Sequence, residues 1–102
     1  MSNPLISVIL PVYNNATTVE AAARSMLRQT ISDMELIIID DGSSDDSVAV
    51  VERIRDPRIR VYRNDRNIGC SASRNRGLDI MRGAYMAPMD ADDICHPRRL
   101  EL

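Results

Sequence analysis

The sequence predicts an α/β fold built on a parallel β-sheet of about four strands with helices on both faces. Two observations predict it. Four short aliphatic runs alternate with three segments of helical character, in the order strand, helix, strand, helix, strand, helix, strand. No internal repeat, linker or low-complexity tract interrupts this order, and 102 residues suffice for one compact domain with one core. We therefore expect a single unit over residues 1–102, its strands joined by right-handed crossovers.

The first strand is expected at residues 5–12 (LISVILPV), a run rich in β-branched residues and too short for a helix. Such a run is typical of a strand buried on both faces, and Pro11 marks its expected end. Residues 17–20 match a capping box. The apolar residues that follow share one helical face and predict the first helix: Val19, Ala22, Ala23, Met26 and Leu27.

A second buried strand is expected at residues 36–39, and the acids and glycine of residues 40–42 turn the chain after it. Residues 43–46 carry another helix-capping signature. The helix that follows is expected to end before Pro57, since a proline cannot continue it. Its apolar positions include Val48, Val51 and Ile54.

Residues 59–62 predict a third strand, and residues 67–69 a loop. A helix of weaker periodicity is expected at residues 71–81, ended by Gly83. The fourth strand is expected at residues 85–89, although Pro88 within it cannot donate to a strand ladder.

Composition excludes several classes of protein. No apolar run approaches the ~20 residues needed to span a bilayer, and the N-terminus lacks the features of a signal peptide. We expect a soluble intracellular protein or a piece of a membrane-associated one. Cys70 and Cys95 are too far apart in sequence, and too isolated from histidines, to indicate a zinc site or a disulfide framework. The three tyrosines do not interleave with clustered cations, so no nucleic-acid partner is expected.

Ligands of parallel sheets bind beyond the carboxyl ends of the strands. That rule places residues 13–14, 40–41 and 90–93 on one rim of the predicted sheet. The last of these segments carries three carboxylates within four positions, which repel one another unless water or a cation neutralises them. Magnesium and manganese prefer oxygen ligands, so a divalent metal is one reading. A polar turn that caps the next helix is the other.

Asp40 and Asp41 also admit two readings. Acids before a helix are ordinary caps, but one would suffice, and a second carboxylate at a strand tip can accept hydrogen bonds from a ribose or a base. Neither GxxxxGK[ST] nor GxGxxG is present, and the chain contains no lysine. These absences argue against a P-loop kinase and a dehydrogenase.

Residues 67–77 place two arginines near the start of the third helix. Arg74 has the planar fork that binds phosphate or stacks on a base, and a surface salt bridge is the alternative. Cys70 is expected to pack, and His96 to lie on the surface or in a packing contact rather than act in catalysis.

Four segments together resemble the family 2 glycosyltransferases, which have the GT-A fold. They are residues 7–14 (SVILPVYN), 37–47 (IIIDDGSSDDS), 66–77 (RNIGCSASRNRG) and 89–93 (MDADD). The resemblance covers nearly the whole chain and implies the Rossmann-like, nucleotide-binding half of a GT-A domain. One departure is Ser73, where alanine is common, a small-for-small change.

The resemblance implies inverting transfer of a sugar from a UDP- or dTDP-sugar to an acceptor hydroxyl, with Mn²⁺ or Mg²⁺ as cofactor. The acceptor would be a carbohydrate or a lipid-linked molecule, in polysaccharide biosynthesis of the cell envelope, in the cytoplasm or at the inner face of the membrane. By this resemblance, Pro11 and Tyr13 would line the nucleoside pocket, and Asp41 with Asp40 beside it would contact the base or the ribose. Arg74 would face the nucleotide. In the acidic loop, Asp90 would lie on the side that faces the ribose, and Asp92 would bind the metal.

Family members continue past the acidic loop into an acceptor-binding half that holds the general base, and no residue of this chain matches that base. We therefore expect an engineered or natural fragment that binds donor and metal without catalysing transfer. An incompletely covered fourth strand should favour self-association.

Two alternatives are a non-catalytic nucleotide- or metal-binding regulatory module and a receiver-type signalling domain. The receiver domain would need an acidic pair after its first strand and a late lysine, and this sequence has neither.

Overall fold

The computed structural model describes residues 4–29 and 32–89. Its elements follow the predicted order: β1 (Ile6–Val12), α1 (Val19–Leu27), β2 (Met34–Asp40), α2 (Ser47–Glu52), β3 (Ile59–Arg63), α3 (Cys70–Ile80) and β4 (Tyr85–Pro88). The four strands form one parallel sheet in the order β3-β2-β1-β4. The predicted α/β fold and its parallel sheet are confirmed.

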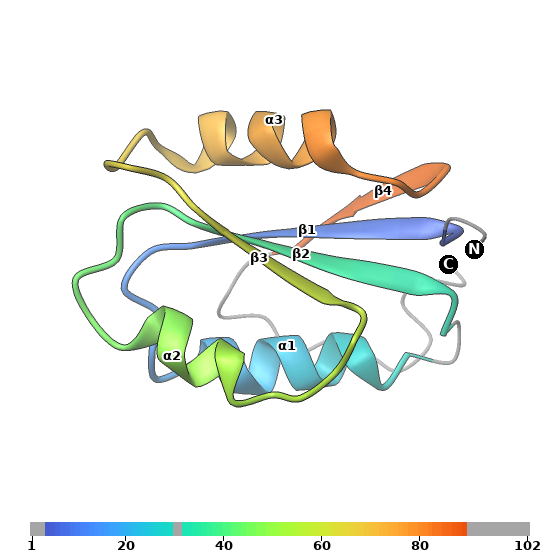
Figure 1. Ribbon diagram of the computed structural model, residues 1–102, viewed down its shortest axis with the longest axis horizontal. Coiled ribbons are helices and arrows are strands. Elements are labelled where there is room, and N and C mark those ends of the chain that lie inside the picture. Colours follow the sequence, from blue (N-terminus) through green and yellow to red (C-terminus); the bar gives the residue numbers. More distant parts are fainter. Residues whose placement is uncertain (1–3, 30–31, 90–102) are drawn as a thin grey trace.

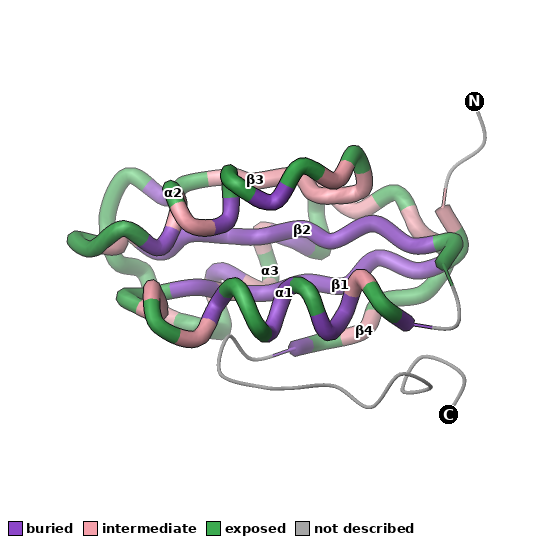
Figure 2. The backbone as a smooth tube through the Cα atoms, turned by 90° about the horizontal axis from the view of Figure 1, so that it is seen from below, coloured by how far each residue is buried: buried purple, intermediate pink, exposed green. Residues whose placement is uncertain are grey.

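The helices form two layers around the sheet. Figure 1 shows α1 and α2 side by side on one face and α3 alone on the other. Helices on both faces were predicted, and a helix on each side leaves the central strands without a solvent-facing surface. Figure 2 accordingly shows β1 and β2 as the most continuously buried part of the backbone. Among the described residues no helix has the length and apolar character needed to cross a membrane.

Alternation of side chains along β1 and β2 divides the core in two. The larger cluster faces α1 and α2 and includes Val8, Leu10, Leu36 and Ile38, all of them buried. The smaller one consists of Ile9, Ile37 and Ile39, with Tyr62 and Ile80 packed against it. The prediction that both strands are buried on both faces is therefore confirmed.

Helix α3 approaches the sheet through small residues. Its buried positions are Ser73 and Gly77. A Cβ atom at Gly77 would lie 2.6 Å from Cγ2 of Ile9, so the helix backbone sits directly on β1. This close approach explains why the sequence shows weak periodicity there, since the buried face of α3 is small rather than apolar.

Several boundaries differ from those expected. β2 begins at Met34, two residues early, and β1 continues through Pro11 to Val12. α2 ends at Glu52, which leaves Ile54 beyond the helix although its side chain is buried.

The capping box of α1 is also absent. Thr18 is the N-cap and its side chain makes no capping hydrogen bond. The backbone N–H of Val19 donates instead to the carbonyl of Asn15 at 2.8 Å. The orphan donors at this helix start are thus partly satisfied by a turn of the preceding chain.

A buried carboxylate stabilises the amino edge of the sheet. Glu35 on β2 accepts hydrogen bonds from the Ser7 hydroxyl, the Arg60 guanidinium and the backbone N–H of Arg82. Burial alone would raise the pKa of Glu35, but the hydrogen bonds from Ser7, Arg82 and Arg60 lower it below its ordinary value. Because Arg82 precedes β4, this carboxylate helps to direct the chain into the edge strand.

Candidate functional site

The carboxyl ends of β1 and β2 meet at one edge of the sheet. The backbone N–H of Asp41 donates to the carbonyl of Val12 at 2.7 Å, so the chain segments that leave the two strands start side by side. Tyr13 and Asn14 follow β1, while Asp40 ends β2 and Asp41 follows it. Their predicted position on one rim is confirmed, and residues 90–93, assigned to the same rim, lie outside the described residues.

Asn14 joins the loop after β1 to the loop after β2. Its backbone N–H donates to the Ser43 hydroxyl at 2.9 Å, and its side-chain oxygen accepts from the Ser44 N–H at 2.8 Å. Asn14 has a φ of 53°, in the left-handed region that asparagine tolerates better than most residues. The two loops are thus hydrogen-bonded to each other in both directions.

Asp45 makes a second connection between the same loops. Its carboxylate accepts from the backbone N–H groups of Ala16 at 3.1 Å and Ser47 at 3.0 Å, while the Ser47 hydroxyl accepts from the Asn15 N–H at 2.8 Å. The side-chain hydrogen bond from Ser47 is the main cause of a lowered pKa at Asp45. The serines of residues 43–47 and Asp45 therefore hold the loop that carries Tyr13, in addition to leading into α2.

Asp41 is buried, and its carboxylate is already occupied. It accepts hydrogen bonds from the backbone N–H groups of Ile68 at 2.8 Å and Gly69 at 2.9 Å, and from the side-chain amide of Asn64 at 2.9 Å. Burial would raise the pKa of Asp41, but these donors and the Ser73 hydroxyl together lower it. The carboxylate fixes the loop that leads into α3, and it does not extend into solvent.

Asp40 is also buried, but its carboxylate is only partly used. Oδ2 accepts from the Ser43 N–H at 3.1 Å and lies 3.7 Å from the guanidinium Nε of Arg63. Oδ1 has no hydrogen-bond partner among the residues that the structure describes. A buried carboxylate oxygen normally has a donor, so Oδ1 is an unsatisfied polar atom at the described part of this rim.

Two polar residues to which the sequence analysis gave no structural role, Asn64 and Ser73, hold this edge together. Asn64, which follows β3, donates from its side-chain amide to the Ser73 hydroxyl at 3.0 Å as well as to Asp41. Its carbonyl oxygen accepts from Arg76 at 2.6 Å. Ser73 was expected to be a simple exchange of one small residue for another, and its hydroxyl proves to take part in the network. No periodic pattern marks an isolated asparagine or serine, so sequence reasoning had no signal for them.

The remaining predicted residues divide by exposure. Tyr13 is 48% exposed at the tip of β1, and Pro11 and Arg74 are half-buried. Cys70, which was expected to pack, is an exposed free thiol at the start of α3. Asp90, Asp92 and His96 lie outside the described residues, and within residues 4–29 and 32–89 no group of three or more potential metal ligands occurs.

The sheet is parallel and has helices on both faces, and its carboxyl edge carries hydrogen-bonded polar loops and buried carboxylates. These features define the class of α/β domain that binds nucleotides at that edge. Residues 7–102 match the family described as Glycosyl transferase family 2, and the chain belongs to that family. The resemblance carried by the four sequence motifs is confirmed.

Related proteins agree with this assignment. The chain is 36% identical over 102 residues to the Escherichia coli UDP-Glc:alpha-D-GlcNAc-diphosphoundecaprenol beta-1,3-glucosyltransferase WfgD, covering all of this chain and 40% of that protein. It superimposes on the Staphylococcus aureus TarS 1–349 structure in complex with UDP-GlcNAc with a TM-score of 0.89 and 27% identity, covering 95% of this chain and 29% of that one.

A more distant structure shares the fold alone. The mannosyltransferase PcManGT from Pyrobaculum calidifontis, solved with GDP-Man and Mn²⁺, matches with a TM-score of 0.81 at 23% identity, covering 90% of this chain and 28% of that one. The chain thus has a GT-A-like fold, and it spans less than half the length of each of these three proteins.

Proposed function

We propose that this chain is the donor-binding part of an inverting glycosyltransferase that transfers a sugar from a UDP- or dTDP-sugar to an acceptor hydroxyl. The observation that carries the proposal is the carboxyl edge, where three loops are hydrogen-bonded together around Asp40 and Asp41. Such an edge is the ligand-binding side of a doubly wound sheet. Membership of the family and the similarity to a structure holding UDP-GlcNAc support the same ligand class.

The exposed ring of Tyr13 would pack on the nucleoside, with Pro11 beneath it and Arg74 contributing a cation. Asp40 and Asp41 would divide their roles. Asp41 would act indirectly, because its carboxylate already holds the loop before α3. Asp40 retains an oxygen without a described partner. It would accept a hydrogen bond from the base or the ribose after a small shift of the loop that follows β2.

A divalent metal, Mn²⁺ or Mg²⁺, would be held by Asp92, with Asp90 on the ribose side. Carboxylate oxygens are the ligands that both ions prefer, and a protein of the same fold was solved with Mn²⁺ and a nucleotide sugar. When bound, the metal would neutralise charge on the diphosphate.

Transfer itself also needs a general base beside the acceptor hydroxyl. We propose that this base belongs to the additional length present in the relatives, and that the 102 residues bind donor and metal. A carbohydrate or lipid-linked acceptor in cell-envelope polysaccharide synthesis fits, at the cytoplasmic face of the membrane, since WfgD is named for a diphosphoundecaprenol-linked acceptor.

Calorimetric titration with UDP-GlcNAc, dTDP-glucose and GDP-mannose, with and without Mn²⁺, tests the proposal. We expect binding that requires the metal and is lost in Asp92→Ala. Tyr13→Ala should weaken binding about tenfold, because aromatic stacking on a base contributes roughly 1–3 kcal/mol. If no heat of binding is detected with any of the three donors, the proposal is refuted. Binding without preference among them would favour the alternative of a non-catalytic nucleotide-binding module.

Tyr85→Ala is the matched control. Tyr85 is 66% exposed at the start of β4, opposite Ile6 and therefore at the amino edge of the sheet. The same chemical change away from the proposed site should leave donor affinity unchanged. Equal effects of the two substitutions would mean that Tyr13 does not touch the nucleoside.

A further inference from the structure

Four arginines line one hollow of about 260 Å³ at the amino edge of the sheet, away from the carboxyl edge. They come from three segments: Arg24 and Arg28 at the end of α1, Arg55 after α2, and Arg58 just before β3. We propose that this hollow is an anion site that binds a phosphate group. The proposal does not depend on the proposed transferase function, because it concerns a different edge of the sheet.

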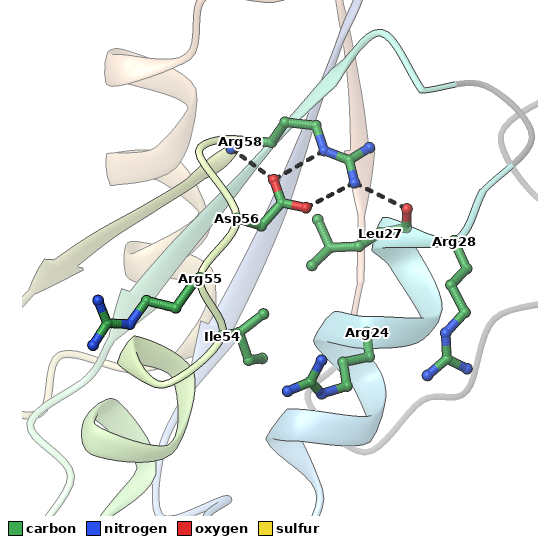
Figure 3. Close-up of a pocket in the computed structure, with 7 residues that line it drawn as sticks. All are labelled: Arg24, Leu27, Arg28, Ile54, Arg55, Asp56 and Arg58. Carbon is green, nitrogen blue, oxygen red and sulfur yellow. Dashed lines mark hydrogen bonds and ion pairs between the residues drawn. The ribbon is translucent and has the colours of Figure 1, made fainter.

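One wall of the hollow is held together by the hydrogen bonds of Arg58. The Arg58 guanidinium donates to both carboxylate oxygens of Asp56, at 3.1 and 2.9 Å, and also to the backbone carbonyl of Leu27 at 3.1 Å, as Figure 3 shows. Buried Ile54 and half-buried Leu27 supply apolar lining. Arg58 therefore ties the end of α1 to the segment before β3, the two chain segments between which the hollow lies.

The carboxylates nearby neutralise only two of the four arginines. Asp56 is consumed by its two-oxygen contact with Arg58, and Glu20 pairs only with Nε of Arg24, which leaves the terminal nitrogens of Arg24 available. Within residues 4–29 and 32–89, the side chains of Arg28 and Arg55 make no ion pair or hydrogen bond. The lining thus contains four arginines and a single carboxylate.

The C-terminus of α1 would ordinarily disfavour an anion, because its last carbonyls carry partial negative charge. In this structure those carbonyls are satisfied. The N–H of Arg28 donates to the carbonyl of Arg24 at 3.2 Å, that of Gln29 to Met26 at 3.2 Å, and Arg58 to Leu27. The arginine side chains are left to set the potential of the hollow.

The arginines of the lining and the size of the hollow point to phosphate. A guanidinium presents paired N–H donors that match phosphate oxygens, and it is the usual side chain for such recognition. The hollow is smaller than the roughly 300–1,000 Å³ of pockets that enclose drug-sized ligands. A phosphate or diphosphate group therefore fits, either from a soluble molecule or from a lipid headgroup.

Calorimetric titration of the protein with inorganic pyrophosphate, in buffer free of divalent metal, tests the soluble source. We expect binding that weakens with added salt and falls about tenfold or more in Arg28→Gln/Arg55→Gln, which removes the two charges of the lining that no described residue pairs. Neither side chain has a described partner, so the variant should fold. Arg53→Gln/Arg82→Gln removes the same charge from exposed residues outside the hollow and should bind as the unmodified protein does.

Co-sedimentation with phosphatidylcholine vesicles, with or without phosphatidylglycerol, tests the lipid source. Binding to the anionic vesicles that is lost in Arg28→Gln/Arg55→Gln but kept in the control supports a headgroup site. Pyrophosphate binding without vesicle binding supports a site for a soluble phosphate. The proposal is overturned if neither probe binds, or if both double variants weaken binding equally.

Discussion

Asp41 contributes to the carboxyl edge through its contacts with the loop before α3. It follows a buried strand and precedes a glycine turn, which indicates a helix cap or a ligand contact from sequence. In the structure its carboxylate instead accepts two backbone N–H groups and one side-chain amide from residues 64–69. The loop that begins α3 therefore depends on a residue of β2's end.

Asp41→Ala should lower the free energy of unfolding by about 2–4 kcal/mol, because each buried donor left unpaired costs roughly 1–3 kcal/mol. Denaturant unfolding at neutral pH measures the change. Asp46→Ala is the matched control: Asp46 is exposed and makes no side-chain capping hydrogen bond, so its loss should change stability by about 0.5 kcal/mol or less. Equal losses in the two variants would contradict this role for Asp41.

The same residue predicts a pH dependence. Its folded-state pKa lies below the ordinary value of 3.8, so its contribution is fully present above that pH and is lost as pH falls through the lower folded value. Asp41→Asn has no titrating group at this position. The stability difference between the unmodified protein and this variant should therefore shrink below pH 3.8, and a difference that grows there would have the wrong sign.

The positions of Asp40 and Asp41 could be predicted from sequence, but their partners could not. A buried strand followed by acids places carboxylates at a strand end by local pattern alone. Asn64 and Ser73 reach Asp41 from a distant loop and helix. Such contacts arise only once the sheet brings β2 and β3 together, and single polar residues carry no periodic signal that anticipates it.

Helix α3 makes the corresponding point at the scale of elements. Its existence was predicted from the turn before it and the glycine after it, while its apolar periodicity was weak. The structure supplies the reason, because Gly77 and Ser73 form the buried face. A helix whose buried face consists of glycine and serine has no periodic apolar residues by which its position could be predicted. Helix α1 packs through the apolar residues Val19, Ala22 and Met26, and it was predicted well.

Gly77→Ala tests this packing. Alanine favours a helix over glycine by about 1 kcal/mol, but overpacking a core costs roughly 1–3 kcal/mol. The added Cβ would lie 2.6 Å from Cγ2 and 3.0 Å from Cδ1 of Ile9, a fully buried side chain with little room to move. We expect net destabilisation, measured as a lower denaturant midpoint.

Asn75→Ala controls for helix propensity, since Asn75 is an exposed position of the same helix. That substitution should leave stability unchanged or raise it slightly. If Gly77→Ala were as stable as Asn75→Ala, α3 would not be held as closely to β1 as the structure shows.

At the scale of the whole molecule, the sheet has a well-buried centre and two edge strands, β3 and β4. β1 and β2 lie in the middle of the order β3-β2-β1-β4 and are covered on both faces. β4 pairs with β1 on one side, and no described strand pairs with its other side. The alternation of elements predicted the parallel sheet, and the edge position of β4 agrees with the proline that made this strand the weakest of the four predictions.

An exposed strand edge with apolar side chains is a template for pairing with another chain. Tyr85 is 66% and Met86 37% exposed on β4, and Leu5, whose carbonyl accepts from the Tyr85 N–H at 3.1 Å, is exposed beside them. We therefore propose that the protein self-associates through β4, and we expect light scattering to show an apparent mass that rises with concentration. Met86→Lys should shift the apparent mass toward that of the monomer, because a lysine on an edge strand opposes pairing.

Leu78→Lys makes a similar change on α3, where Leu78 is also exposed, and should not alter the apparent mass. A monomer at every concentration, or equal effects of the two lysines, would show that the β4 edge is not an association surface.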